Sequence, residues 1–174
     1  PLPTLWLEPD GAADVQESVR IQSVVTSNPD AFFEPHYADT LAQMVADITA
    51  VHGPLPLASL ARRVAQSHGW QRTGHRIATR VETALSAVER HTDLGTEFVW
   101  STGTYANRIP ARPLGERAIR EVHPAEIATT IEVHAEAIIA AEDPMLDLAR
   151  RLGIARLSQD ARDYLEACVE WCDQ

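Results

Sequence analysis

Residues 57–90 read LASLARRVAQSHGWQRTGHRIATRVETALSAVER, in which two segments with apolar residues at helical spacing flank a glycine-containing turn. The first segment predicts a helix over residues 57–68, which Gly69 would end. Thr73 is a suitable N-cap for a second helix that runs to about residue 90. Two short helices joined by a tight turn are the arrangement of a helix-turn-helix pair.

The segments on either side extend this pair into a larger unit. Residues 39–52 have apolar residues at helical spacing and predict a preceding helix, which Gly-Pro-Leu-Pro at 53–56 ends. On the other side, Thr-Asp-Leu-Gly at 92–95 predicts a turn, and residues 97–100 predict a short strand. Three helices followed by a small hairpin describe a winged helix, so we expect a winged-helix-like unit with a β wing over residues 39–104.

Positive charge is concentrated on the predicted helix-turn-helix pair. Residues 61–81 contain five arginines and no acid, although the whole chain has a net charge of −10. Arg72, Arg76 and Arg80 recur every four residues, so on a helix they would lie along one edge. A basic edge on such a helix predicts contact with a polyanion, namely a nucleic acid. The candidate nucleic-acid-binding residues are Arg62, Arg63, Arg72, His75, Arg76, Thr79 and Arg80.

Four aromatic or imidazole side chains near this pair have two interpretations each. His68 and His75 flank the turn, where they would either contact phosphate or be ordinary exposed turn residues. Trp70 and Trp100 would either stack on bases or pack into the core of the turn and the wing, and core packing is the interpretation we prefer.

Charge varies along the chain in four blocks. The net charge is −6 over residues 1–39, +1 over 40–104, +3 over 105–120 and −8 over 121–174. The middle of the chain is therefore basic and both ends are acidic, unlike a uniformly acidic enzyme. Two interpretations are open: the acidic ends are ordinary solvated faces, or the basic middle binds an anionic partner.

The remaining segments surround the first unit. Residues 1–38, rich in Pro, Asp and Ser, predict an irregular lead-in or linker, and residues 105–120 predict an Arg- and Pro-containing connector. Residues 121–174 predict a second helical unit, in which Asp143 and Ser158 would be helix N-caps. No strand signal follows its last helix. We therefore expect a mainly α protein with two tandem winged-helix-like units, the second without a wing.

The second unit repeats the first at an offset of 84 residues, although helical apolar patterns align easily by chance. Apolar positions keep their character, and Gly69 aligns with Gly153. At three positions that we expect to face outward, the second unit has a different type of residue: Asp160 aligns with Arg76, Asp163 with Thr79 and Tyr164 with Arg80. The second unit should therefore share the scaffold of the first and lack its basic face.

Six short motifs stand out in the middle and the end of the chain. They are VHGPLP at 51–56, LARRV at 60–64, GWQRTGHRI at 69–77, FVW at 98–100, VHPAEI at 122–127 and LARRLG at 148–153. Together, over residues 38–170, they resemble an uncharacterised domain at the C-terminal end of large superfamily-1 DNA helicases, often beside a restriction-type nuclease domain. Leu-Ser-Gln at 157–159 departs from the Thr-Gly turn that the family tends to keep there. The resemblance implies a module of a helicase–nuclease in defence against foreign DNA, and it assigns no catalytic residue.

The types of residue present exclude several kinds of catalytic site. All 15 basic residues are arginine, so neither a P-loop lysine nor a Schiff-base lysine is available. His134 and Glu136 match the His-x-Glu of zinc deaminases, but the Pro-Cys-x-x-Cys that supplies the other ligands is absent. Cys168 and Cys172 fit one packed face of a helix better than a metal site. We therefore expect no enzyme activity, no cofactor and no metal.

These observations lead to two hypotheses of function. The first is a non-catalytic DNA-binding accessory module of a larger helicase–nuclease, in which the first unit makes about four phosphate contacts. The second is a protein–protein docking or scaffold module that orders the neighbouring helicase and nuclease domains. No apolar run is long enough to span a membrane. Two cysteines are too few for a disulfide framework, which is consistent with the reducing cytoplasm that we expect as the location. The chain begins at Pro1 with no Met, so we also expect it to be a piece of a longer protein or a processed product.

Overall fold

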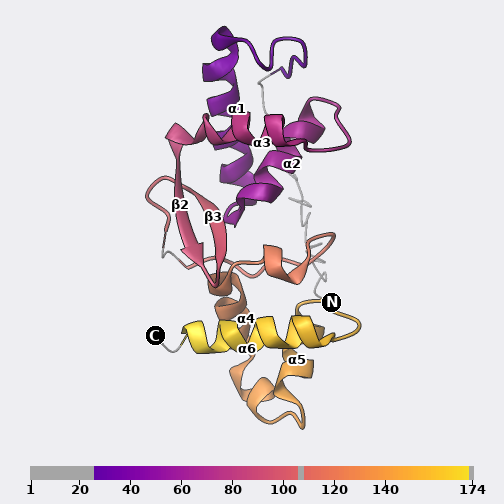
Figure 1. The fold of residues 1–174 in the computed structure, drawn as a ribbon. Helices are drawn as coiled ribbons and strands as arrows, with labels where there is room; N and C mark the ends of the chain where they lie inside the picture. Colours follow the sequence, from indigo (N-terminus) through magenta and orange to yellow (C-terminus); the bar gives the residue numbers. More distant parts are fainter. Residues whose placement is uncertain (1–25, 106–107, 173–174) are drawn as a thin grey trace, which may run out of the picture.

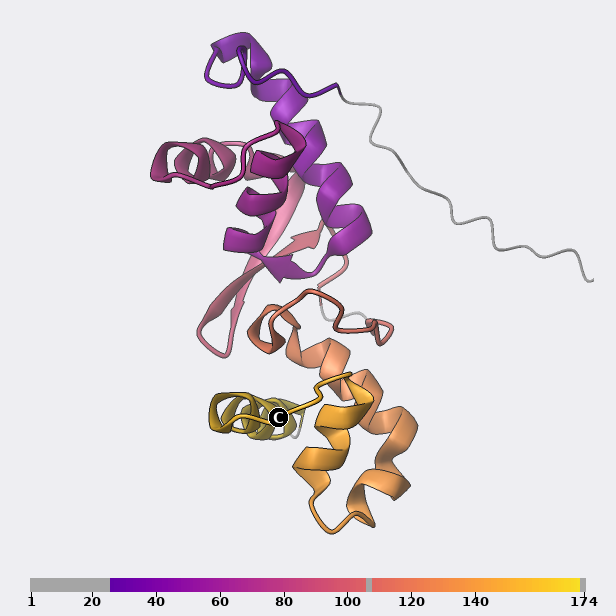
Figure 2. The same cartoon turned by 90° about the vertical axis from the view of Figure 1, so that its right-hand side faces the viewer.

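The computed structural model describes residues 26–105 and 108–172. These residues form six α-helices and a three-stranded antiparallel sheet, which confirms the expectation of a mainly α protein. Figure 1 shows two helical units stacked end to end, with the sheet of the first unit pointing toward the second. Figure 2 shows the same stacking from the side.

The first unit contains three helices, three strands and two short 3-10 turns. In chain order these are η1 (Pro35–Tyr37), α1 (Ala38–His52), β1 (Leu55–Pro56), α2 (Leu57–Ser67), α3 (His75–Glu82), η2 (Leu85–Ala87), β2 (Val88–Asp93) and β3 (Thr96–Ser101). Both β1 and β2 pair antiparallel with β3, so the sheet order is β1-β3-β2. The sequence did not indicate β1, because two residues are too few to show an alternating pattern.

The turn after α2 closes as its glycine predicts. Gly69 has a φ of 78°, in the left-handed region that glycine adopts at low cost. Its amide donates to the carbonyl of Gln66 at 2.9 Å, and the amide of Trp70 donates to the carbonyl of Ala65 at 3.0 Å. These two bonds form a Schellman cap, which sets the direction in which the chain approaches α3.

α3 is shorter than the sequence predicts. It runs from His75 to Glu82, and the residues expected to continue it to about residue 90 form η2 and the start of β2 instead. In β2, Arg90 lies opposite Val99 of β3. This hairpin pairing outweighs the helical spacing of the apolar residues in this segment.

The start of α3 also differs from the prediction. Gly74 is the N-cap residue in place of Thr73, and no side chain caps the helix. The hydroxyl of Thr73 is buried without a hydrogen-bond partner among the described residues. The first turn of α3 therefore lacks the side-chain acceptor that a threonine cap would have supplied.

Part of the predicted lead-in belongs to the core of the first unit. Phe32 is fully buried, and its ring lies edge-on to His68 and Trp70 at centroid distances of 4.8 and 4.9 Å. Tyr37 is also buried, and its hydroxyl lies 2.9 Å from Nε2 of His68. The first unit therefore begins before residue 39, and the prediction of a linker is wrong for residues 29–38. Residues 1–25 of the lead-in lie outside the described residues.

The second unit consists of three helices after a short 3-10 turn. These are η3 (Ile119–Glu121), α4 (Pro124–Ile139), α5 (Pro144–Arg151) and α6 (Gln159–Cys172), with no strand among the described residues of this unit. Both predicted caps are confirmed, because Asp143 accepts from the amide of Leu146 at 3.0 Å and Ser158 accepts from the amide of Ala161 at 3.2 Å. Ile127, Leu148 and Leu165 are fully buried and form the centre of a separate apolar core.

The backbone of the second unit repeats the turn of the first at the predicted offset. Gly153 has a φ of 89°, and the amide of Ile154 donates to the carbonyl of Ala149 at 2.9 Å, as Trp70 does to Ala65. One expectation about side chains is wrong. Tyr164, predicted to face outward, is 2% exposed and donates its hydroxyl hydrogen bond to the carbonyl of Val122 at 2.7 Å.

A buried polar contact joins the tip of the β2–β3 hairpin to the second unit. Nδ1 of His123 accepts from the amide of Ala125, so Nε2 carries the proton and donates to Asp93 at 3.1 Å. The other carboxylate oxygen of Asp93 accepts from the indole nitrogen of Trp171 at 3.2 Å. The hairpin, the start of α4 and the end of α6 therefore meet at one carboxylate.

Candidate nucleic-acid interface

Four of the seven candidate residues form an exposed surface on α3 and the turn before it. Arg72 lies in the turn, and His75, Arg76 and Thr79 lie on the helix, all of them exposed. Positions 75, 76 and 79 fall on one side of a helix. Neither Arg72 nor Arg76 forms an ion pair with any carboxylate of the described residues. Two guanidinium groups are therefore available there to an outside anion.

Arg76 is held in place by an aromatic ring. Its guanidinium carbon lies 4.7 Å from the centroid of Phe33, a side chain that is itself 44% exposed. Stacking of this kind uses the face of the guanidinium group and leaves the N–H donors at its edge available. The lead-in thus presents Arg76 to solvent in a restricted orientation.

Arg80 has a different role from its neighbours on α3. It is half-buried, and it donates from Nε to the carbonyl of Phe32 at 3.2 Å and from Nη2 to the carbonyl of Glu34 at 3.0 Å. These bonds attach the lead-in to α3. Arg80 therefore positions the segment that carries Phe33, and we do not count it as a full phosphate ligand.

Arg62 and Arg63 lie on α2 and line a separate cleft, to which no candidate residue of α3 contributes. Nη2 of Arg62 lies 2.6 Å from Oε1 of Glu121, and the same oxygen accepts from the hydroxyl of Ser59 at 2.8 Å. Burial alone would raise the pKa of Glu121, but the hydrogen bonds from Arg62 and Ser59 outweigh it and lower the pKa. The guanidinium group of Arg62, a candidate nucleic-acid-binding residue, therefore already has a carboxylate partner within the chain.

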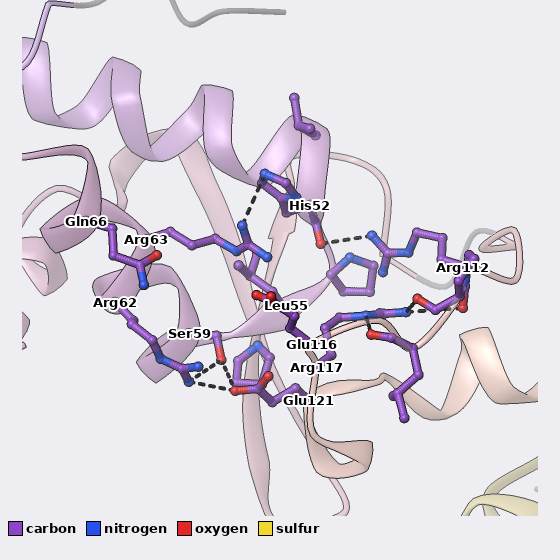
Figure 3. A pocket seen from close by; sticks show the side chains of 15 residues that line it. His52, Leu55, Ser59, Arg62, Arg63, Gln66, Arg112, Glu116, Arg117 and Glu121 are labelled. Carbon is purple, nitrogen blue, oxygen red and sulfur yellow. Dashed lines mark hydrogen bonds and ion pairs between the residues drawn. The ribbon is translucent and has the colours of Figure 1, made fainter. Parts of the chain in front are cut away.

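The cleft lies between the first unit and the connector and has a volume of about 420 Å³ (Figure 3). Arg63 points into it and places Nη1 3.4 Å from Nε2 of His52. Because a guanidinium group can only donate, His52 is the acceptor of this contact. Burial lowers the pKa of His52, and the charges of Arg63 and Arg112 lower it further. His52 is therefore neutral beside two cations.

The connector arginines are neutralised by the second unit. Arg112 and Arg117 both contact Glu126, a fully buried carboxylate, at 2.6 and 2.8 Å. Burial alone would raise the pKa of Glu126, but the bonds from Arg117 and Arg112 outweigh it and lower the pKa. The other two connector arginines also have acidic partners: Arg108 pairs with Glu132 and Arg120 with Asp160. All four arginines of the connector are therefore paired with carboxylates of the same molecule.

The aromatic and imidazole candidates divide between core and surface. His68 is 3% exposed and bonds to Tyr37 and to the carbonyl of Val64, so it does not reach an outside phosphate. Trp70 packs against the first core, and Trp100 is 2% exposed, which confirms the preferred interpretation of core packing. His75 alone of the two turn histidines is exposed.

Two features of the described residues bear on wider classes of function. No group of three or more His, Cys, Asp or Glu side chains among them is placed to bind a metal ion together. None of their helices combines the length and the apolar character that crossing a membrane requires.

Glu121 and Glu126 were not predicted to be partners of the arginines. Both follow the connector within a few residues of Arg117 and Arg120, in the segment that includes the VHPAEI motif. An alternation of arginine and glutamate at this point was the available signal of an internal charge cluster.

Comparison with known families gives one finding. Residues 30–79 match a family described as "Protein of unknown function (DUF3320)". The matched range begins at the lead-in that packs on the first core and ends inside α3. It confirms the resemblance to a domain of unknown function for this part of the chain. No curated protein and no solved structure matches the chain.

Proposed function

We propose that the first unit is a winged-helix-type module that binds nucleic acid without catalysing a reaction, with α3 as its recognition helix. Support comes from the element order α1-β1-α2-α3-β2-β3 and from the central position of β3 in the sheet. In this arrangement a helix-turn-helix pair precedes a β hairpin, and the second helix of the pair is the one that enters a groove.

One observation carries the proposal. Arg72 and Arg76 are exposed and have no carboxylate partner among the described residues, whereas all four connector arginines have one. Arg72 and Arg76 lie near each other in a stretch, residues 61–81, that contains no acid, so together they present a local site for phosphate. His75 and Thr79 are exposed on the same side of α3 and would face the groove.

The hairpin is not part of the proposed contact surface. Asp93 at its tip bonds to His123 and Trp171 of the second unit, and Leu94 packs against the core of that unit. The wing is therefore docked internally. Nucleic acid would contact α3 and the turn before it, through fewer phosphates than the sequence alone suggested.

We place this module within a larger cytoplasmic helicase–nuclease that acts against foreign DNA, on the strength of the sequence motifs. The second unit would be a degenerate winged-helix-like repeat, since it lacks a strand among its described residues and pairs Asp160 with Arg120. Its acidic surface would keep the nucleic acid on the first unit by repulsion.

The experiment is a fluorescence-anisotropy titration of a labelled DNA duplex with the chain at low salt. The double variant Arg72→Ala/Arg76→Ala should bind at least about tenfold more weakly, because charge-assisted hydrogen bonds contribute about 1.5–3 kcal/mol each. Arg156→Ala is the matched control, because Arg156 is the exposed equivalent of Arg72 in the second unit and has no carboxylate partner among the described residues. Equal loss in the control and in the double variant would contradict the assignment to α3.

A protein-docking role is the second candidate. It is favoured by α4, on which Val133 is 63% exposed and Ile139 is 78% exposed. Exposed branched residues on a helix that also carries acids suit a partner protein better than a polyanion. This function predicts that Val133→Ser/Ile139→Ser abolishes co-purification with the helicase and nuclease domains of the parent protein, and that duplex DNA does not bind.

A further inference from the structure

The cleft between α2 and the connector has one unsatisfied positive charge. Arg62 pairs with Glu121, while Arg112 and Arg117 share Glu126. Arg63 contacts only the neutral His52 and has no carboxylate partner among the described residues. The cleft therefore has four positive charges, on Arg62, Arg63, Arg112 and Arg117. Three carboxylates lie in or behind it, those of Glu116, Glu121 and Glu126, so one positive charge is in excess.

Besides its charged side chains, the cleft has an apolar part and the polar side chains of His52, Ser59 and Gln66. Leu55 lies beside the guanidinium groups in Figure 3, and the neighbouring lining includes Val51, Pro54, Pro56 and Leu114. Rigid proline and leucine surfaces suit a flat organic body better than a hydrated ion. A volume of about 420 Å³ also exceeds what an isolated inorganic anion would fill.

We propose that this cleft binds a small phosphomonoester of nucleotide size, with its phosphate on Arg63 and its organic body against Leu55 and the prolines. The side chain of Gln66 lies beside Arg63 at the same wall and provides a neutral donor for a phosphate oxygen. This site is distinct from the surface of α3, and it does not depend on nucleic-acid binding there.

The titration of the His52 ring should show whether a phosphate is bound in the cleft. Burial lowers the pKa of His52, and the charges of Arg63 and Arg112 lower it further, so the protonated form is disfavoured. A phosphate bound at Arg63 would offset those cations and make protonation of His52 easier. Binding should therefore move the titration of the His52 ring toward higher pH, an effect that a ligand on α3 would not cause.

The test is an NMR titration of the full chain with AMP, in which the ring signals of His52 and the amides of α2 are followed. We expect saturable shifts of these signals and a higher titration midpoint for His52 with AMP present. Inorganic phosphate and adenosine, titrated separately, should each bind more weakly than AMP. Shifts that do not saturate, or signals that change only on α3, would overturn the proposal, as would equal binding of AMP and adenosine.

Two variants separate this site from the proposed nucleic-acid interface. Arg63→Ala should weaken AMP binding about tenfold or more, because it removes the one uncompensated cation. Arg76→Ala, at an exposed arginine outside the cleft, should leave AMP binding unchanged. The wild-type titration decides the proposal even if Arg63→Ala unfolds. Loss of AMP binding in Arg76→Ala with retention in Arg63→Ala would refute the assignment.

Discussion

Arg62 of α2 donates a 2.6 Å hydrogen bond to Glu121, which follows it by 59 positions at the end of the connector. The contact attaches the connector to the first unit and neutralises a guanidinium group that would otherwise face solvent. It also shows how an acidic chain can neutralise part of a basic segment with its own carboxylates. The surface that an outside polyanion meets is therefore smaller than the count of arginines suggests.

Glu121→Gln should release Arg62 at little cost in stability. The Arg62 side chain is 51% exposed, so we expect a loss of less than about 1 kcal/mol in the free energy of unfolding. Duplex DNA should bind slightly more tightly, because the variant removes one negative charge near α2. Urea denaturation and the anisotropy titration measure the two effects. Weaker DNA binding in Glu121→Gln would contradict this role.

Glu126→Ala should be far more damaging. Glu126 is fully buried between Arg112 and Arg117, and its removal leaves two partly buried cations without their carboxylate. Breaking a buried ion pair from one side costs about 3–5 kcal/mol. The control Glu132→Ala breaks an exposed pair with Arg108 and should cost less than about 1 kcal/mol. Equal losses in the two variants, by urea denaturation, would show that Glu126 does not hold the connector.

The same two glutamates should make the free energy of unfolding depend on pH in the acidic range. The pKa values of Glu121 and Glu126 are both lowered in the folded chain. Their contribution is therefore complete above the ordinary glutamate pKa of about 4.3 and is lost as the pH falls below it through the lowered values. Unfolding by urea at a series of acidic pH values should show this loss in the wild type, and a smaller one in Glu121→Gln.

His123 should make the free energy of unfolding depend on pH in a second range, at higher pH than the glutamates. Burial lowers its pKa, although the hydrogen bond and the charge of Asp93 act in the opposite direction. Since the folded state disfavours the protonated ring, the stability from His123 is present above its unfolded pKa of about 6.5 and is lost as the pH falls through the lowered value. His52 shifts in the same direction. His123→Gln should remove part of the loss; an unchanged profile would mean that other groups cause it.

Phe32 tests whether the lead-in belongs to the first unit. Its ring is fully buried against His68 and Trp70, so Phe32→Ala should cost about 3–5 kcal/mol. Phe33→Ala is the matched control, because that neighbouring ring is 44% exposed and its removal should change stability by only about 0.5 kcal/mol. Thermal unfolding compares the two. Similar melting temperatures for both variants would mean that the lead-in is not a structural part of the unit.

Local signals predicted much of the fold, and non-local contacts explain the errors. The caps at Asp143 and Ser158 and the turns at Gly69 and Gly153 depend on neighbouring residues, and the sequence predicted them correctly. The end of α3 depends on pairing within the β2–β3 hairpin, and the burial of Phe32 and Tyr164 depends on contacts with distant residues; helical spacing records neither.

The candidate site was predictable in part for the same reason. Exposure of Arg76 follows from helical spacing, and Arg72 is exposed in the turn before α3. The pairing of Arg62 with Glu121, by contrast, requires the chain after the connector to fold back on α2. The bonds of Arg80 to the lead-in likewise join residues 46 and 48 positions apart. Long-range contacts of this kind decide which arginines are available, and a single sequence carries no direct record of them.

The most direct test of the nucleic-acid interface is the salt dependence of duplex DNA binding. With Arg72 and Arg76 as the main phosphate contacts, the logarithm of the association constant should fall with the logarithm of salt concentration at a slope of about −2. The double variant Arg72→Ala/Arg76→Ala should reduce that slope to near zero, whereas Arg156→Ala should retain it. A wild-type slope near zero, or a slope unchanged in the double variant, would contradict the account.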